Sequence, residues 1–304
     1  MTIRRTLRRA AATACAASLF TATVAYAQDT IVVEGARIET ADIRSTARDI
    51  TSGANAMFQP LARFQRPVCP GVYGLSEVNA QAVVDRIAAN AIAAGIDVNE
   101  EPGCGANVWV VVVDDVAATF DNLVEEDSFM TRHLTPFQLR SVRSQEGDAR
   151  GWNLITSRNP ETGLALPDGF ERAQAAYEAQ QTGNPPPVNQ INNMSRLELA
   201  VRSDIELSVL LVERSAMADL DVGALADYAT MRLFASTETP SGDSPVSTVL
   251  TLFDPEEGDY APRQMTAFDK AYLAALYRSS PTRPARLAMG GIEDLMEQIG
   301  DAED

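Results

Sequence analysis

Residues 107–114 of the chain, NVWVVVVD, decide the fold, because they form a nearly continuous run of β-branched residues. Such a run is typical of a strand at the centre of a sheet, buried on both faces. Ile205–Glu213 (IELSVLLVE) predicts a second buried strand, and Gly151–Arg158 (GWNLITSR) predicts a third. Arg63–Val72 contains two prolines, which remove ladder donors, so we expect an extended segment or an edge strand there.

Helical patterns separate these strands and gather at the end of the chain. The clearest helix is expected from Ser76, which can cap it, to Ala94, with Gly95 as its stop. Thr135 opens a capping box with a proline at the first helical position. Further helices are expected at Asp42–Thr51, Val116–Glu126, Val222–Ala235, Thr266–Tyr277 and Gly291–Ile299. This order predicts a single α+β domain with a mixed sheet and helices clustered toward the C-terminus.

The segment 159–193 differs in composition from the rest of the chain. It is rich in Pro, Gln and Asn, it has three consecutive prolines after Asn184, and it shows little periodicity. We expect a surface insertion there, with one short helix at Glu171–Gln180. A structural protein whose insertion docks a partner is one interpretation of this pattern.

The N-terminal residues 1–27 have the pattern of a signal peptide. Four arginines precede an apolar run over residues 10–24, and Ala25-Tyr26-Ala27 matches a cleavage site. The run is too short to span a bilayer, and no later segment reaches about 18 uncharged apolar residues. We therefore expect a periplasmic or secreted mature chain, residues 28–304, with no transmembrane segment and with a first strand at Ile31–Ile38.

Two cysteines remain in the mature chain, Cys69 and Cys104. Outside the cytosol two lone cysteines are far more often bridged than catalytic, so we expect a disulfide, with a catalytic thiol as the alternative. The bridge would close a loop of 35 residues and stabilise the fold by roughly 3–4 kcal/mol in the chain-entropy model. It would pin the start of the first long helix to the start of the central strand.

The chain is strongly acidic, with a formal net charge of −17 at pH 7. Phosphate backbones and anionic membrane surfaces would be repelled, which argues against nucleic acid and a permanent lipid surface as partners. Cations or basic partners fit this charge, although it also simply favours solubility. The expected partner is an unidentified protein or small molecule.

Residues that most catalytic sites need are scarce. His133 is the only histidine, whereas a catalytic zinc site usually has three protein ligands, mostly histidines. The chain has no G-x-S-x-G elbow, no Walker loop and no G-x-G-x-x-G turn after a strand. We therefore expect neither a metal nor a cofactor. Carboxylates are the remaining candidates for acid–base chemistry, above all Asp114 and Asp115 after the central strand, and the segment 254–259 (DPEEGD).

The region from Ile205 to Ser279 resembles the catalytic half of zincin metalloproteases, in their matrixin-like layout. In that family a strand precedes a helix with the sequence A-H-E-x-x-H-A-L-G. A turn with Met follows, and then a helix that begins L-[ST]-x-x-D and ends A-L-Y. Here Ile205–Glu213 takes the strand position, Leu225–Phe234 (LADYATMRLF) the metal-helix position, and Met265–Tyr277 the closing helix. The chain is also similar to secreted bacterial proteins of this build.

This resemblance implies a metalloprotease scaffold that lacks its metal ligands. Asp227 stands at the first metal histidine, Tyr228 at the general-base glutamate and Met231 at the second histidine. None of these three can perform the family role at neutral pH. The resemblance therefore implies a pseudo-metalloprotease in which Asp227, Tyr228 and Met231 line a vestigial cleft, where Arg232 would fix an anionic group.

Two functions from different classes follow. The preferred one is a non-enzymatic secreted or periplasmic protein that binds a ligand or interacts with the cell envelope, with no catalytic residue. The alternative is a metal-independent hydrolase that uses the carboxylates of Asp114, Asp115 and Asp227. The hydrolase requires these carboxylates to converge in a deep cleft, whereas a binding protein requires a groove or an exposed apolar patch.

Overall fold

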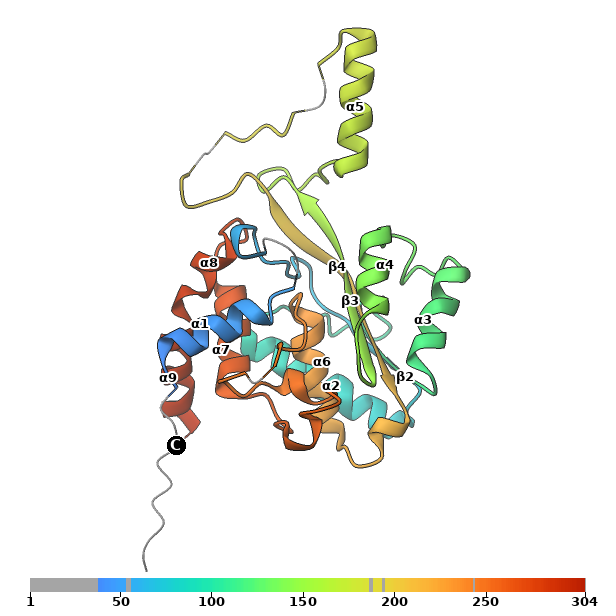
Figure 1. Ribbon diagram of the computed structural model, residues 1–304, viewed down its shortest axis with the longest axis vertical. Helices are drawn as coiled ribbons and strands as arrows, with labels where there is room; N and C mark the ends of the chain where they lie inside the picture. Colours follow the sequence, from blue (N-terminus) through green and yellow to red (C-terminus); the bar gives the residue numbers. More distant parts are fainter. Residues whose placement is uncertain (1–37, 53–55, 186–187, 193–194, 243, 304) are drawn as a thin grey trace, which may run out of the picture. The chain divides into compact units, whose positions relative to one another are not determined.

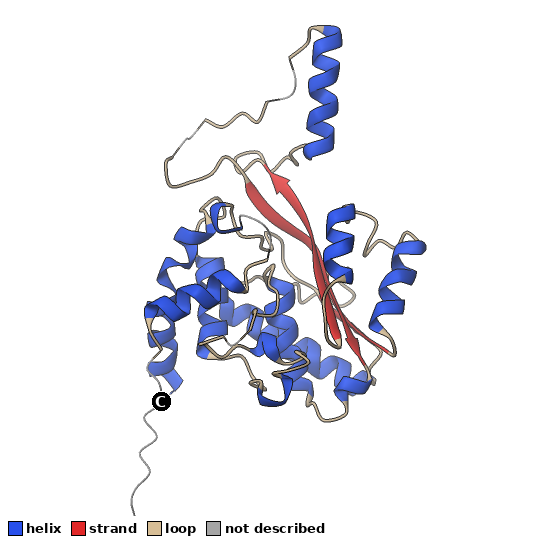
Figure 2. Ribbon diagram, viewed as in Figure 1, coloured by secondary structure: helices blue, strands red, loops and turns tan. Residues whose placement is uncertain are grey.

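A four-stranded open sheet organises the residues that the computed structural model describes, namely 38–52, 56–185, 188–192, 195–242 and 244–303 (Figures 1 and 2). The spatial order of its strands is β1-β2-β4-β3. The first three in this order are parallel, and β3 pairs with β4 in the antiparallel direction, which leaves β3 with a free edge. The predicted leader and the predicted strand that begins at Ile31 lie outside the described residues. The strands are β1 (Pro70–Tyr73), β2 (Val108–Val113), β3 (Ala149–Arg158) and β4 (Arg202–Glu213).

Helices cover both faces of this sheet (Figure 1). On one face α2 (Glu77–Ala94) and α6 (Val222–Phe234) pack against each other and against the larger hydrophobic core. On the other face α3 (Val116–Glu125) and α4 (Pro136–Arg143) pack on β4 and β3 through a smaller core around Trp152. The sheet is therefore the middle layer of three.

The central strand β2 is buried on only one face. Val108, Val110 and Val112 are buried in the larger core, while Trp109 and Val111 on the other face are half-buried. The prediction of a strand buried on both faces is therefore wrong for the second face. The reason is that this face of β2 lies at the margin of the smaller core, which is centred on β3 and β4 and covers Trp109 and Val111 only in part.

Several helices begin and end where the sequence predicts. Ser76 caps α2, and Gly95 ends it in the left-handed conformation. Capping boxes open α4 at Thr135 and α7 (Ala267–Arg278) at Thr266, each satisfying backbone N–H groups that the first turn leaves free. Local capping chemistry was therefore a reliable guide to these boundaries.

Helices of the C-terminal region pack together beside the sheet. α7 packs against α9, and α1 contacts α9. This arrangement confirms the predicted class, one mixed-sheet domain with helices clustered toward the C-terminus. The remaining α-helices are α1 (Thr40–Asp49), α5 (Gly169–Thr182), α8 (Ala285–Ala288) and α9 (Ile292–Glu303), and short 3-10 helices lie at Ala56–Phe58, Ser215–Met217, Val249–Thr251, Gly258–Tyr260 and Met289–Gly291.

α6 is buried more deeply than its sequence predicts. The pattern predicts one apolar face, but every residue from Ala224 to Phe234 is buried. The helix is enclosed by the sheet, α2, α7 and the short helix Val249–Thr251. A buried polar group is costly unless it finds partners, so the polar side chains of this helix, Asp227, Thr230 and Arg232, need internal ones.

The chain between β3 and β4 contains α5, which includes the helix predicted at Glu171–Gln180. None of the residues of α5 is buried. At the base of this connection, the Asn159 side chain donates hydrogen bonds to Oδ1 of Asn189 and to the carbonyl oxygen of Gln190.

Cys69 and Cys104 form the predicted disulfide, with Cα atoms 6.1 Å apart. Cys69 directly precedes β1 and Cys104 lies shortly before β2, so the bridge ties the starts of two neighbouring parallel strands and not, as predicted, the start of the long helix to the central strand. Such a disulfide fits an extracellular or periplasmic compartment. Within the described ranges, no helix is both long and apolar enough to cross a membrane.

Candidate functional site

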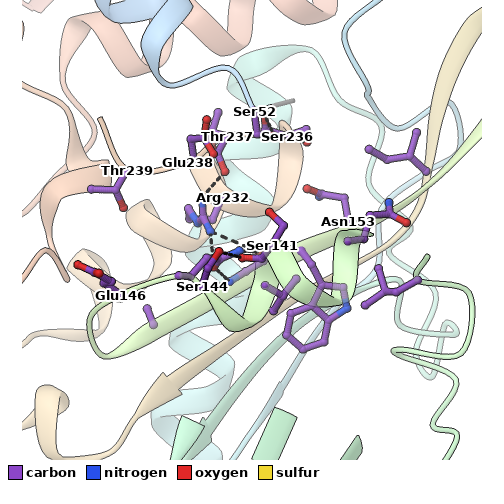
Figure 3. Close-up of a pocket in the computed structure, with 18 of the residues that line it drawn as sticks. Ser52, Ser141, Ser144, Glu146, Asn153, Arg232, Ser236, Thr237, Glu238 and Thr239 are labelled. Atoms are coloured by element: carbon purple, nitrogen blue, oxygen red, sulfur yellow. Dashed lines mark hydrogen bonds between the residues drawn. The ribbon is translucent and has the colours of Figure 1, made fainter. Parts of the chain in front are cut away.

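A pocket of about 960 Å³ opens at the free edge of β3, and we call it the edge pocket (Figure 3). It lies between α4, the C-terminal half of α6 and the segment 236–240. Its volume is typical of a small-molecule or peptide site. Hydroxyl and amide groups make up much of its lining, among them Ser52, Gln138, Ser141, Ser144, Ser236 and Thr239.

Arg232 of α6 lies at the floor of the edge pocket and is only 4% exposed. Its Nη1 donates to the carbonyl oxygen of Thr237. Its Nη2 donates to Oε1 of Gln145 at 3.0 Å and to the carbonyl oxygen of Gly151 at 3.4 Å. Figure 3 shows this guanidinium between the α4 side chains and the segment that carries Thr237 and Glu238.

Gly151 of β3 allows the arginine to approach the strand closely. A Cβ atom at this position would lie 3.1 Å from both Nε and Nη2 of Arg232. Glycine in a strand often marks such a close approach, because any side chain would press on the neighbouring group. The planar guanidinium therefore lies directly against the backbone of β3 at Gly151.

No carboxylate within the described part of the chain forms an ion pair with Arg232, although the charge of Glu238 interacts with it at longer range. The hydrogen bonds of its guanidinium go to two carbonyl oxygens and one amide oxygen, and its Nε–H is buried without an acceptor. Buried charges in proteins are normally paired, because an unpaired one is costly to desolvate. An anionic group in the pocket would neutralise this charge.

Gln145, just after α4, holds the arginine and the strand together. Its Nε2 donates to the carbonyl oxygen of Gly151 at 2.8 Å, and its Oε1 accepts the N–H of Gly151 at 2.9 Å. The side-chain amide thus pairs with β3 as the backbone of a neighbouring strand would. Because the same Oε1 accepts from Arg232, Gln145 orients the guanidinium relative to the free edge.

Three acidic residues, Glu146, Glu238 and Asp254, also line the pocket. Glu146 and Glu238 are exposed, and neither forms an ion pair with a residue that the structure describes. Partial desolvation raises the pKa of Glu238, and Arg232 opposes this rise. The pocket therefore has a cationic floor and an anionic rim.

Tyr228, one helical turn before Arg232, also lines the edge pocket. Its ring packs edge-on against Phe253, with centroids 4.7 Å apart, and burial raises the pKa of its phenol. Met231, by contrast, is fully buried in the larger core and does not line the pocket. The structure thus brings Tyr228 and Arg232 to one pocket and places Met231 elsewhere.

Asp227, the fourth predicted site residue, does not line the edge pocket but lies in the contact between α6 and α2. Its Oδ1 accepts from Nε of Arg86 at 2.7 Å and from Nδ2 of Asn90 at 2.8 Å. Its Oδ2 accepts from Nη2 of Arg86 and from the N–H of Met265. Burial alone would raise its pKa, but these hydrogen bonds together lower it. The carboxylate therefore ties α6 to α2 and to the turn before α7.

The carboxylates proposed for a hydrolase do not converge. Asp114 is largely exposed and binds Nε of Arg214 at 2.8 Å. Asp115 caps α3, on the sheet face opposite α6, where Asp227 lies. Among the described residues, no group of three His, Cys, Asp or Glu side chains is arranged to hold a metal ion. His133 does not line the edge pocket.

Sequence reasoning missed Gln145, Gly151 and Glu238. A glycine inside a predicted strand was the one available signal, because it marks a close backbone approach. The pairing of the Gln145 amide with β3 depends on how α4 returns to the strand, which no local pattern encodes.

Comparisons with protein-family models, curated protein sequences and solved structures find no match to this chain.

Proposed function

We propose that the chain is a non-enzymatic binding protein, acting outside the cytoplasm, that holds an anionic group of its ligand at Arg232. The observation that carries this proposal is the buried guanidinium that lines a large pocket and forms no ion pair with a carboxylate of the described residues. Arginine suits the role, because its guanidinium stays charged when buried and the hydrogen bonds described above use only three of its five N–H groups.

The remaining pocket groups favour binding over catalysis. Tyr228 has a raised pKa, so its phenol stays protonated at neutral pH and is no general base. Hydroxyl side chains line the pocket, but the single histidine that could activate one does not. Asp114 and Asp115 lie apart from Asp227, which counts against the hydrolase built on these three carboxylates.

The sequence spacing of three pocket residues also agrees with an origin of the edge pocket in a metalloprotease scaffold. Tyr228 and Arg232 are four positions apart, and Glu238 follows six positions later. These are the separations of the three histidines in the H-E-x-x-H-x-x-G-x-x-H motif. The pocket would then correspond to the former metal site. The two helix positions of the metal histidines would be Tyr228 and Arg232, each one residue after Asp227 and Met231, the positions that the resemblance implies. Arginine has no acceptor atom and cannot be a metal ligand. The edge pocket would therefore be the cleft of the former protease without its metal.

A ligand screen tests the proposed function. The full chain would be titrated with small carboxylates and inorganic phosphate, with binding followed by calorimetry and by the thermal unfolding midpoint. For any compound that binds, Arg232→Lys keeps the charge but loses the planar fork. We expect it to cost roughly 2 kcal/mol, or about thirtyfold in affinity.

Arg214→Lys is the matched control, because Arg214 is half exposed and pairs with Asp114 outside the edge pocket. It should bind every compound as the unaltered chain does. Equal affinities for Arg232→Lys and the unaltered chain would contradict the proposed function.

A further inference from the structure

We propose that the anionic group held at Arg232 is the C-terminal carboxylate of a short basic peptide. This inference rests on the proposed function and specifies its ligand.

The distribution of charge in the edge pocket carries the inference. Its one cation, Arg232, lies at the floor and is 4% exposed, whereas Glu146 and Glu238 are exposed lining residues. Both carboxylates lack an ion pair among the described residues, so they are available to a cation. Figure 3 shows Glu146 and Glu238 on different sides of Arg232. A complementary ligand has one anionic end and positive charge a short distance behind it.

The third rim carboxylate strengthens this pattern. Asp254 also lines the pocket, and its Oδ1 is held by the N–H groups of Glu256 and Glu257. Three acidic residues in one pocket would repel a polyanion, as would the net charge of −17. A ligand with several negative groups is therefore disfavoured, although a single terminal carboxylate can reach the floor.

The walls of the pocket fit a peptide backbone. Hydroxyl and amide side chains both donate and accept hydrogen bonds, as the N–H and C=O groups of a peptide require. Ser141 of α4, Ser144 at the end of that helix, Ser236 and Thr239 lie around Arg232 (Figure 3). Phe137, 66% exposed at the start of α4, offers an apolar ring at the same pocket. Capture of a terminal carboxylate is a known mode of peptide recognition.

Three N-acetylated hexapeptides test the inference by calorimetry with the full chain. The first has two lysines among its last four residues and a free carboxylate. The second is identical but amidated at its C-terminus, and the third has glutamates in place of the lysines. We expect the first to bind most tightly, and the second and third to bind at least tenfold more weakly.

Rim variants provide a test that does not depend on the buried arginine. Glu146→Gln and Glu238→Gln alter exposed side chains, so the protein should fold normally. Each should weaken binding of the lysine peptide severalfold and leave a lysine-free alanine peptide unaffected. Glu125→Gln is the control, because Glu125 is an exposed residue of α3 outside the edge pocket.

The outcomes separate this inference from the proposed function. If small carboxylates or sugar acids bind at Arg232 but the free and amidated peptides do not differ, the ligand class is wrong and the proposed function stands. If the peptides bind and Arg232→Lys leaves their affinity unchanged, both are wrong. Loss of affinity on amidation, on lysine replacement and in the rim variants supports the inference.

Discussion

Gly151 shows how one residue without a side chain can support a site. A Cβ at this position would sit 3.1 Å from two nitrogens of Arg232, which is tighter than an ordinary contact. We predict that Gly151→Ala shifts the guanidinium, costs roughly 1 kcal/mol of unfolding free energy and weakens anion binding severalfold. Denaturant unfolding and calorimetry measure the two effects.

Gly169→Ala is the control, because nothing lies within 4 Å of a Cβ at the first position of α5. It should leave stability and binding unchanged. Unaltered binding in Gly151→Ala would mean that the close approach of Arg232 to β3 is irrelevant to the ligand.

Asp227 contributes to stability rather than to the pocket. We predict that Asp227→Asn lowers the unfolding free energy by about 2 kcal/mol at neutral pH, less than for a fully buried pair because Arg86 is 43% exposed. The folded-state pKa of Asp227 is lowered. Its contribution is therefore complete above the unfolded pKa of about 4, and it disappears as the pH falls through the folded value.

Denaturant unfolding of the unaltered chain and of Asp227→Asn, between neutral and strongly acidic pH, measures the difference in their unfolding free energies. It should shrink only below about pH 4. Asp114→Asn, which alters a largely exposed ion pair, should cost less than about 1 kcal/mol throughout. A difference for Asp227→Asn that grows on acidification would contradict this assignment.

Elements with strong local signals could be predicted from the sequence, and elements that depend on their neighbours could not. Ser76 and Gly95 bound α2, and the capping box at Thr135 starts α4, because caps are local chemistry. The burial of α6 on all sides depends on α2, α7 and the sheet, which no helical period reveals. For the same reason the sequence did not distinguish Tyr228 and Arg232, which line the pocket, from Asp227 and Met231, which do not.

α5 is the element that the fold needs least. Since none of its residues is buried, replacing Gly169–Thr182 by a short Gly/Ser linker should change the unfolding free energy by less than about 1 kcal/mol. Binding at the edge pocket should be unaffected. A large loss of stability would show that α5 makes structural contacts, and a loss of ligand affinity would show that it contributes to the site.

At the scale of the whole molecule, the edge pocket combines parts of the chain that are far apart in sequence. It is lined by Ser52, by residues within the region 134–155, by the end of α6 with the segment 236–240, and by Asp254. The composition predicted an acidic chain with few of the residues that catalytic sites need, because both are properties of the residues themselves. It could not predict that one arginine would be enclosed at the edge of the sheet, because this depends on the packing of α4 and α6 around β3.

The most direct test of the account compares the unfolding free energy of the unaltered chain with that of Arg232→Met, with and without the tightest-binding carboxylate. Without ligand we predict that the variant lies within about 1 kcal/mol of the unaltered chain or above it, because the unpaired buried charge is costly. With ligand at a hundredfold its Kd, the unaltered chain should gain about 2.7 kcal/mol and the variant nothing. A loss of several kcal/mol without ligand, or equal gains with it, would make Arg232 a structural residue and contradict the account.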